Sequence, residues 1–177
     1  MISNLVASAG SVSVEWEVPA RHNHPVTNPI SESVEPGATS RWLVERFYDE
    51  VWNSANESVA RAILHPDFAF RGSLGPTRIG HEGFIAYVRS THAALGEYTC
   101  IIDDLIATRD RVAAKMTFTG IHRGVFFGMP ATGLRITWAG SAFFTTDGHR
   151  ITKLWVLGDI DAIKSQLGAG ANAPFSE

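Results

Sequence analysis

Hydrophobic residues recur along the chain with two periods: from residue 40 a mainly helical period, interrupted by a short alternating segment at 67–71, and from Tyr98 onward an alternating one. Over residues 41–53 the apolar side chains form one helical stripe with charged residues opposite, which predicts an amphipathic helix. A short helix over residues 56–64, capped by the asparagine that opens it, and a third helix over residues 81–95 follow. Thr39 or Ser40 is the expected N-cap of the first helix.

The alternating period predicts a series of strands. They cover residues 67–71, 98–107, 112–122, 134–145 and 151–159, and a final helix covers residues 161–167. Asp147-Gly148, between the last two strands, is a strong hairpin signal. Because helices precede an antiparallel meander, we expect an α+β fold with three helices packed on a strongly curved, mostly antiparallel sheet. Such a sheet would leave an apolar pocket beneath the helices.

Residues 1–39 differ from the rest of the chain and form an N-terminal extension. Within it, residues 11–18 alternate apolar and polar side chains like a strand, and four prolines follow. The extension is either a partly ordered tail or an arm that lies across the domain or a partner subunit. The compact domain spans residues 40–168, and residues 169–177 form a C-terminal tail.

Composition narrows the function classes. With 177 residues, 45% of them hydrophobic, the chain fits one domain with a substantial core. A net charge of −3 and scattered basic residues argue against nucleic acid as a partner. The single cysteine, Cys100, excludes a cysteine-based zinc cluster, and His22 and His24 lack a third metal ligand. With no secretory signal and no apolar run of ~20 residues, we expect a cytoplasmic protein without a membrane partner.

The strongest candidate for chemistry is Asp159, which ends the apolar run that begins at Trp155. A carboxylate among large apolar residues is costly unless it is paired or protonated, and proton-transfer groups are made in this way. Asp159 is therefore the predicted acid/base group. The alternative is structural, because Asp159 also precedes the final helix, where it or Asp161 could bond the first-turn amides.

Two further side chains are candidates for substrate contact. His122 shares the inward face of its strand with Met116 and Phe118, and an imidazole can give or take a proton near neutral pH. The alternative for His122 is a satisfied core histidine or an anchor for the loop that follows. Arg71 ends a strand before a glycine-rich loop, where it would contact an anion or enolate, or simply face solvent.

Several short segments of the domain, taken together in their order and spacing, resemble a known family. They are residues 47–53, 65–68, 80–84, 119–124 and 127–133, then Trp155 and Asp159, and last residues 166–168. From about residue 40 to residue 168 the chain looks like the SnoaL-like polyketide cyclases and predicted ester cyclases. These belong to the nuclear transport factor 2-like superfamily, together with the ketosteroid isomerases and scytalone dehydratases.

The resemblance implies a cone-shaped α+β barrel with a deep apolar cavity, usually a homodimer through the outer sheet face. It also implies ring closure by an intramolecular aldol step, without metal or cofactor, with an acidic residue at the position of Asp159 as acid/base. Such chemistry needs a positioned base, a donor for the enolate oxygen and exclusion of water. The residues expected to line the cavity are Tyr48, Trp52, Met116, Phe118, Phe126, Trp138, Phe144 and Trp155.

Three functions stay open at this point. The first is a cofactor-free cyclase, isomerase or hydrolase-like enzyme for a small apolar carbonyl compound such as a polyketide or ester. In it, Asp159 would be the base, and His122 with Arg71 would position the substrate. The second is a dimer that sequesters an apolar ligand without catalysis, which the lack of a histidine in residues 141–146 favours. The third is an assembly component that acts through the 1–39 extension.

Overall fold

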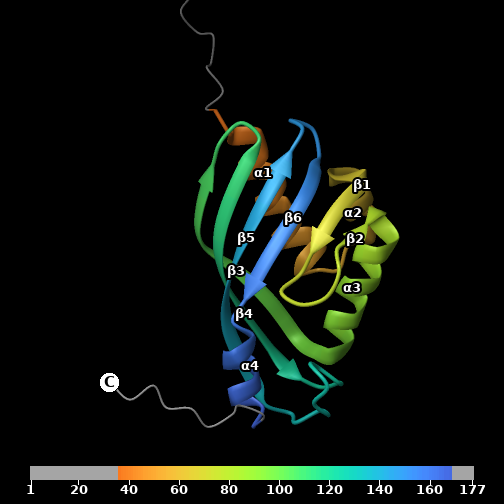
Figure 1. Cartoon of the computed structure of the whole chain (residues 1–177), viewed down its shortest axis with the longest axis vertical. Helices are drawn as coiled ribbons and strands as arrows, with labels where there is room; N and C mark the ends of the chain where they lie inside the picture. Colours follow the sequence, from red (N-terminus) through yellow and green to blue (C-terminus); the bar gives the residue numbers. More distant parts are fainter. Residues whose placement is uncertain (1–35, 169–177) are drawn as a thin grey trace, which may run out of the picture. The chain divides into compact units, whose positions relative to one another are not determined.

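The computed structural model describes residues 36–168, which form one α+β unit (Figure 1). Its elements are α1 (Ala38–Arg46), the π-helix η1 (Phe47–Trp52), α2 (Glu57–Ile63), β1 (Leu64–Arg71), β2 (Arg78–Ile79), α3 (Gly80–Ala94), β3 (Leu95–Ala107), β4 (Arg111–His122), β5 (Arg135–Thr146), β6 (Ile151–Gly158) and α4 (Ile160–Gln166). The predicted arm, the histidines at positions 22 and 24, and the C-terminal tail lie outside the described residues.

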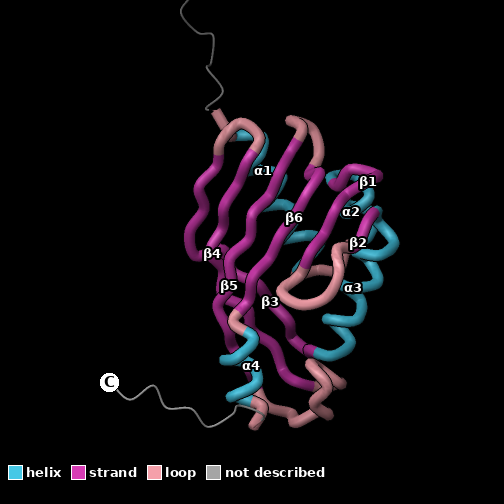
Figure 2. The backbone as a smooth tube through the Cα atoms, viewed as in Figure 1, coloured by secondary structure: helices cyan, strands magenta, loops and turns pink. Residues whose placement is uncertain are grey.

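The six strands form one mixed sheet in the order β2-β1-β6-β5-β4-β3. Only the β1–β6 pair is parallel, so the predicted α+β class and mostly antiparallel sheet are confirmed. Helices α1, α2 and α3 lie on one side of the sheet (Figure 2). Strands β2 and β3 form the two edges and the sheet does not close, so the barrel implied by the resemblance is open. In this part of the chain no helix is long and apolar enough to cross a membrane.

The first predicted helix is two elements, because its hydrogen-bond pattern widens after Arg46. In η1 the Asn53 amide donates to the Tyr48 carbonyl five residues back, at 2.8 Å. The wider turn buries four apolar side chains against the sheet: Phe47, Tyr48, Val51 and Trp52. Such π-type turns recur at functional sites, and this one supplies two residues predicted to line a cavity.

Strands β4 and β5 keep the predicted alternation along their whole length. Met116 and Phe118 of β4 face inward, as do Trp138 and Phe144 of β5. Met116 and Phe144 are almost completely buried, and the Phe144 ring packs edge-on against the rings of Phe47 and Tyr48. The inner sheet face thus builds the core directly beneath η1.

Strand β6 breaks its alternation at a bulge. Thr146 and Thr145 of β5 pair with Ile151 and Lys153 of β6, which leaves Thr152 as an extra residue. One extra residue moves every later side chain to the opposite face. After the bulge, Leu154 is therefore buried and Trp155 points outward.

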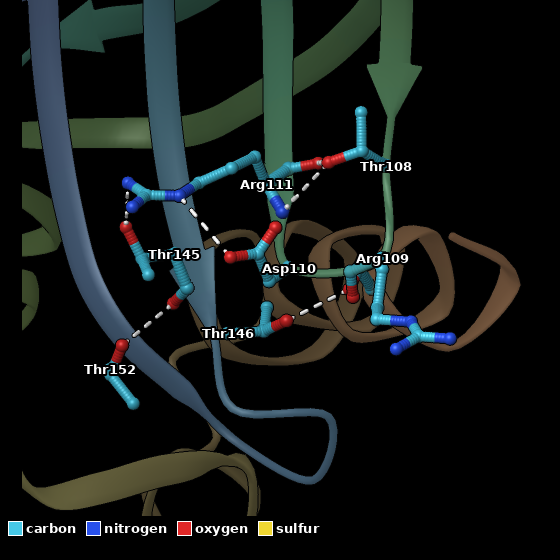
Figure 3. Close-up of polar contacts among 8 residues, drawn as sticks. Thr108, Arg109, Asp110, Arg111, Thr145, Thr146 and Thr152 are labelled. Carbon is cyan, nitrogen blue, oxygen red and sulfur yellow. Dashed lines mark hydrogen bonds and ion pairs between the residues drawn. The ribbon is translucent and has the colours of Figure 1, made fainter. Parts of the chain in front are cut away.

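A group of hydrogen bonds, here called the polar latch, ties the start of α1 to the β3–β4 turn and the end of β5 (Figure 3). The Ser40 hydroxyl donates to the Arg109 carbonyl at 2.6 Å and lies 2.8 Å from the Thr146 hydroxyl, which can donate to it. The Thr146 amide donates to the Asp110 carbonyl at 2.9 Å. The predicted cap was wrong: Gly37 is the N-cap, and Ser40 is turned inward into the latch.

Candidate functional site

A pocket opens between η1, α3 and the inner face of the sheet, with a cavity volume of about 110 Å³. It is lined by Phe47, Tyr48, Trp52, Phe70, Gly72, Ser73, Leu74, Tyr87, Thr91, Tyr98, Phe118, Phe126, Phe127, Trp138, Leu154, Val156, Gly158, Ile160 and Ile163. These residues come from every strand except β2 and from η1, α3 and α4, which is typical of a ligand site built on a rigid frame. The Ser73 hydroxyl accepts from the Gly158 amide at 2.7 Å and holds the loop after β1 against β6.

Parallel aromatic rings form one wall of the pocket. Phe118 and Trp138 are directly paired across β4 and β5, with ring centroids 5.3 Å apart and planes 12° apart. The Tyr98 ring of β3 continues this array, 6.5 Å from Phe118 at 15°. Trp52 stands across from them and stacks on Tyr87 of α3 at 6.0 Å. Flat apolar ligands suit a wall of this kind.

The polar groups of the pocket are neutral. None of its lining residues is an Asp, Glu, His, Lys or Arg. The Trp52 indole N–H donates to the Tyr98 hydroxyl oxygen. The Tyr48 hydroxyl has no hydrogen-bond partner among residues 36–168, nor has the Trp138 indole N–H. An occupant would therefore meet hydrogen-bond donors rather than charges.

Burial fixes the protonation state of the pocket phenols. It raises the pKa of Tyr48 and of Tyr98 well above the usual value for a tyrosine. Burial also raises the pKa of Tyr87, although the nearby Arg78 guanidinium, 4.9 Å from the ring centroid, opposes this. All three hydroxyls stay protonated at neutral pH and can donate a hydrogen bond.

A tight turn carries two phenylalanines to the pocket. The amides of Phe126 and Met129 each donate to the other's carbonyl at 3.0 Å. Phe127 (φ 49°) and Gly128 (φ 79°) are both left-handed, as in a type I′ turn. The Phe126 ring lies 6.1 Å from the Trp138 ring and 6.3 Å from the His122 ring, so it adjoins both.

His122 is inward-facing, as predicted, but it does not line the pocket. It is completely buried, and its Nδ1 lies 3.0 Å from the Thr132 hydroxyl. Its Nε2 is buried with no partner in the described structure. Whichever tautomer is present, one buried ring nitrogen is unsatisfied, at a cost of about 1–3 kcal/mol. Phe126 is the pocket residue whose ring it approaches.

Asp159 has the structural role predicted as its alternative, that of a helix cap. Its side chain is exposed and accepts from the Ala162 amide at 2.9 Å, which makes it the N-cap of α4. The expected desolvation of this carboxylate among apolar residues is therefore wrong. Its neighbours Gly158 and Ile160 do line the pocket, so Asp159 belongs to the pocket rim by backbone position alone.

Arg71 and Trp155 lie together on the outer face of the sheet, away from the pocket. They are paired in register between β1 and β6, and the guanidinium lies 5.7 Å from the Trp155 ring centroid. Trp155 is 39% exposed and contacts the ring of Phe143. The prediction that Trp155 lines the cavity is wrong because the β6 bulge reverses its face.

Five of the predicted lining residues do line the pocket: Tyr48, Trp52, Phe118, Phe126 and Trp138. Met116 and Phe144 belong instead to the core beneath it. Sequence reasoning missed Tyr98 and Tyr87. Tyr98 was detectable, because it lies two residues before the buried Cys100 and so shares its inward face.

Comparison with known proteins agrees with this architecture. The family described as SnoaL-like polyketide cyclase matches residues 42–167. A proposed SnoaL-like polyketide cyclase from Jannaschia sp. CCS1 superposes with a TM-score of 0.71 at 19% identity, over 77% of this chain and 96% of that one. TsrD from Streptomyces laurentii gives 0.67 at 27% identity, over 75% and 96%.

AclR, a proposed hydroxylase from Streptomyces galilaeus, has the same fold, with a TM-score of 0.66 at 19% identity over 78% of this chain and 86% of that one. No curated protein matches the sequence. The fold therefore accompanies more than one proposed chemistry. Because the family match spans well over half of the chain, the protein belongs to the SnoaL-like polyketide cyclase family.

Proposed function

We propose that the protein binds a small, neutral, largely apolar carbonyl compound in its aromatic pocket and promotes its cyclisation or isomerisation without a cofactor. The observation that carries this proposal is the pocket itself, walled by aromatic rings and furnished with uncharged donors. Aromatic walls favour a flat ligand, and phenol or indole N–H donors suit a carbonyl oxygen. Membership of the family supports cyclisation as the reaction class.

Two side chains remain proposals for the proton-transfer group. His122 is supported by its burial, its unsatisfied Nε2 and the single ring, Phe126, that adjoins both it and the pocket. Asp159 is supported by family position and by its place between two lining residues, but its exposure opposes the role. Arg71 lies on the outer face, and nothing in its surroundings supports substrate contact.

The test compares two asparagine variants. His122→Asn retains an amide that can bond Thr132 and removes Nε2, while Asp159→Asn retains the helix cap and removes the carboxylate. We expect His122→Asn to slow turnover by about 10²–10⁴-fold, the usual loss for a general acid or base. Turnover is measured as the ultraviolet change when aryl 1,5-diketones close by intramolecular aldol reaction.

Asp161→Asn is the matched control, because Asp161 is an exposed carboxylate in the first turn of the same helix. A large loss of turnover in Asp159→Asn, with none in Asp161→Asn, would show that Asp159 is the base. Full activity in both His122→Asn and Asp159→Asn would remove each of them from catalysis.

A second function, binding without catalysis, is favoured by one observation. The pocket lining contains no carboxylate and no imidazole, so no lining side chain can act as a base toward an occupant. This function predicts saturable binding of the diketones, unchanged on recovery, with no acceleration of ring closure above buffer. If wild type accelerates ring closure and a His122 or Asp159 variant does not, the protein is an enzyme and not only a binding protein.

We further propose that the protein is a homodimer joined through the outer face of the sheet. Phe143, Trp155 and Leu157 are exposed there, on β5 and β6, and Phe143 pairs directly with Trp155. Exposed apolar clusters of this kind mark association surfaces. We expect Phe143→Ser/Leu157→Ser to shift the sedimenting species from dimer to monomer, and Val125→Ser, exposed in a loop, to leave it unchanged.

A further inference from the structure

The Tyr98 hydroxyl has an acceptor side that is occupied and a donor side that is not. The Trp52 indole N–H can only donate, so in the Trp52–Tyr98 hydrogen bond the phenol oxygen must accept. The hydrogen of the Tyr98 hydroxyl finds no acceptor among residues 36–168, although Tyr98 lines the pocket. The free donor therefore serves whatever occupies the pocket.

Packing holds this donor in place. Tyr98 is 5% exposed; its ring stacks on the Phe118 ring and contacts the His92 ring, 5.3 Å away, in a T-shaped arrangement. The His92 Nε2 lies 2.8 Å from the Trp52 carbonyl, so the residue that orients Tyr98 is itself anchored to α3. A donor fixed before the ligand arrives costs little ordering free energy on binding.

The other pocket phenols lack this support. No indole or amide in the described residues donates to the hydroxyl of Tyr48 or to that of Tyr87. Their hydroxyl oxygens are free to turn either as donor or as acceptor. Tyr98 alone among the three has one role imposed on it by a neighbour.

We propose that Tyr98 determines specificity, and that it selects ligands that present a neutral carbonyl oxygen over hydrocarbons of the same shape. The proposal rests on the proposed function of the pocket as the ligand site. It adds to that function the group that reads the ligand's oxygen and the residue, Trp52, that positions it.

Three naphthalene probes test the proposal by isothermal titration of the full chain. 2-Acetylnaphthalene and 2-ethylnaphthalene differ in one carbonyl oxygen, so the ratio of their dissociation constants isolates its contribution. We expect the ketone to bind about tenfold more tightly, the most that one neutral hydrogen bond usually gives. 2-Naphthaldehyde, with a smaller carbonyl group, should keep most of this preference.

The variants assign the preference to one hydroxyl. Tyr98→Phe frees the Trp52 N–H, so the decisive variant is Trp52→Phe/Tyr98→Phe, which removes both donors and should bring the ratio close to one. Tyr87→Phe, which deletes a lining phenol that no neighbour orients, changes both affinities together and leaves the ratio near ten. Circular dichroism and thermal unfolding show that each variant is folded.

The outcomes separate this proposal from the function on which it rests. If no probe binds, the pocket is not a ligand site, and the function and the inference fall together. If both probes bind wild type equally, or the double variant keeps a tenfold ratio, the pocket stands and Tyr98 does not determine specificity.

An infrared measurement keeps the proposal testable even if the double variant does not fold. The carbonyl stretch of 2-acetylnaphthalene bound to wild type should lie below its frequency in hexane, as expected for a hydrogen-bonded ketone. A frequency equal to that in hexane would overturn the proposal without any variant.

Discussion

The polar latch and the aromatic pocket both hold hydroxyl groups, but the surroundings of these hydroxyls differ. In the latch, Ser40 and Thr146 are at most 4% exposed; their two hydroxyls bond each other, and the Ser40 hydroxyl also donates to the Arg109 carbonyl. In the pocket, the Tyr48 hydroxyl has no hydrogen-bond partner among residues 36–168, and it is not one of the buried unpartnered atoms there, so it opens onto the pocket. The same kind of group is thus bonded within the chain at one site and left open to the contents of the pocket at the other.

The difference separates structure from function. A buried hydroxyl with partners adds about 1 kcal/mol to stability and specifies one arrangement of the elements that it joins. A buried polar group without partners costs stability and calls for an explanation. Among the described residues, the buried side-chain atoms without a partner are His122 Nε2 and Arg78 Nη1, and each residue adjoins a pocket residue: His122 adjoins Phe126, and Arg78 adjoins Tyr87.

The largest effect on stability is expected from a substitution that breaks the latch. Ser40→Ala removes the hydroxyl that joins α1 to both the β3–β4 turn and β5, and leaves the Thr146 hydroxyl without its buried partner. We expect the free energy of unfolding, measured by urea denaturation, to fall by about 1–3 kcal/mol. Binding of 2-acetylnaphthalene to the folded variant should not change, because the latch contributes no lining residue.

Ser54→Ala is the control, since the Ser54 hydroxyl donates to the Asp49 carbonyl at 2.9 Å but is exposed. Water replaces that bond, so we expect a change of less than about 0.5 kcal/mol. Equal losses in Ser40→Ala and Ser54→Ala would show that burial gives the latch no special weight.

The two periods of the sequence predicted the fold class and most helices and strands because burial on one face imposes them directly. Asn56 caps α2 as predicted, its side chain accepting from the Val59 amide at 3.2 Å. The two-residue β2 was missed because its register is set by pairing with β1 rather than by its own pattern. The face of Trp155 was missed because both faces of β6 are apolar, and a bulge at Thr152 then set the phase.

The candidate site was less predictable than the fold because it depends on partners, which lie far apart in the sequence. Strand parity places His122 inward, yet only the structure shows which of its nitrogens is bonded and that Phe126 is the pocket residue beside it. The Trp52–Tyr98 bond joins η1 to β3 and has no local sequence signal. Asp159 fitted two roles from sequence, and the geometry of α4 selected the cap.

An intermediate effect on the free energy of unfolding is expected at alkaline pH, which ionises the pocket tyrosines and leaves the latch residues unchanged. Burial raises the pKa of Tyr98 above its value of about 10 in the unfolded chain, so ionisation of this phenol favours the unfolded state. The contribution of the protonated Tyr98 to the free energy of unfolding is therefore present in full below pH 10 and is lost as the pH rises above 10. The slope is at most about 1.4 kcal/mol per pH unit for each such tyrosine. Tyr98→Phe should flatten the decline in unfolding free energy between pH 10 and 11.

Ser40→Ala supplies the contrast, because the latch bonds involve only hydroxyls and backbone groups that do not titrate in this range. The variant should be less stable at every pH, with the same alkaline slope as wild type. A slope that Tyr98→Phe leaves unaltered would mean that the Tyr98 phenol reaches solvent in the native state.

The smallest expected effect gives the sharpest comparison, because it deletes a hydroxyl that opens onto the pocket and has no partner among residues 36–168. Tyr48→Phe keeps the ring that packs against Phe47 and Phe144 and removes only the oxygen. We expect the free energy of unfolding, measured by urea denaturation at pH 7, to change by less than about 0.5 kcal/mol, where Ser40→Ala loses several times more. A loss as large as that of Ser40→Ala would mean that the Tyr48 hydroxyl is satisfied in the native state, and the contrast between latch and pocket would then not hold for this residue.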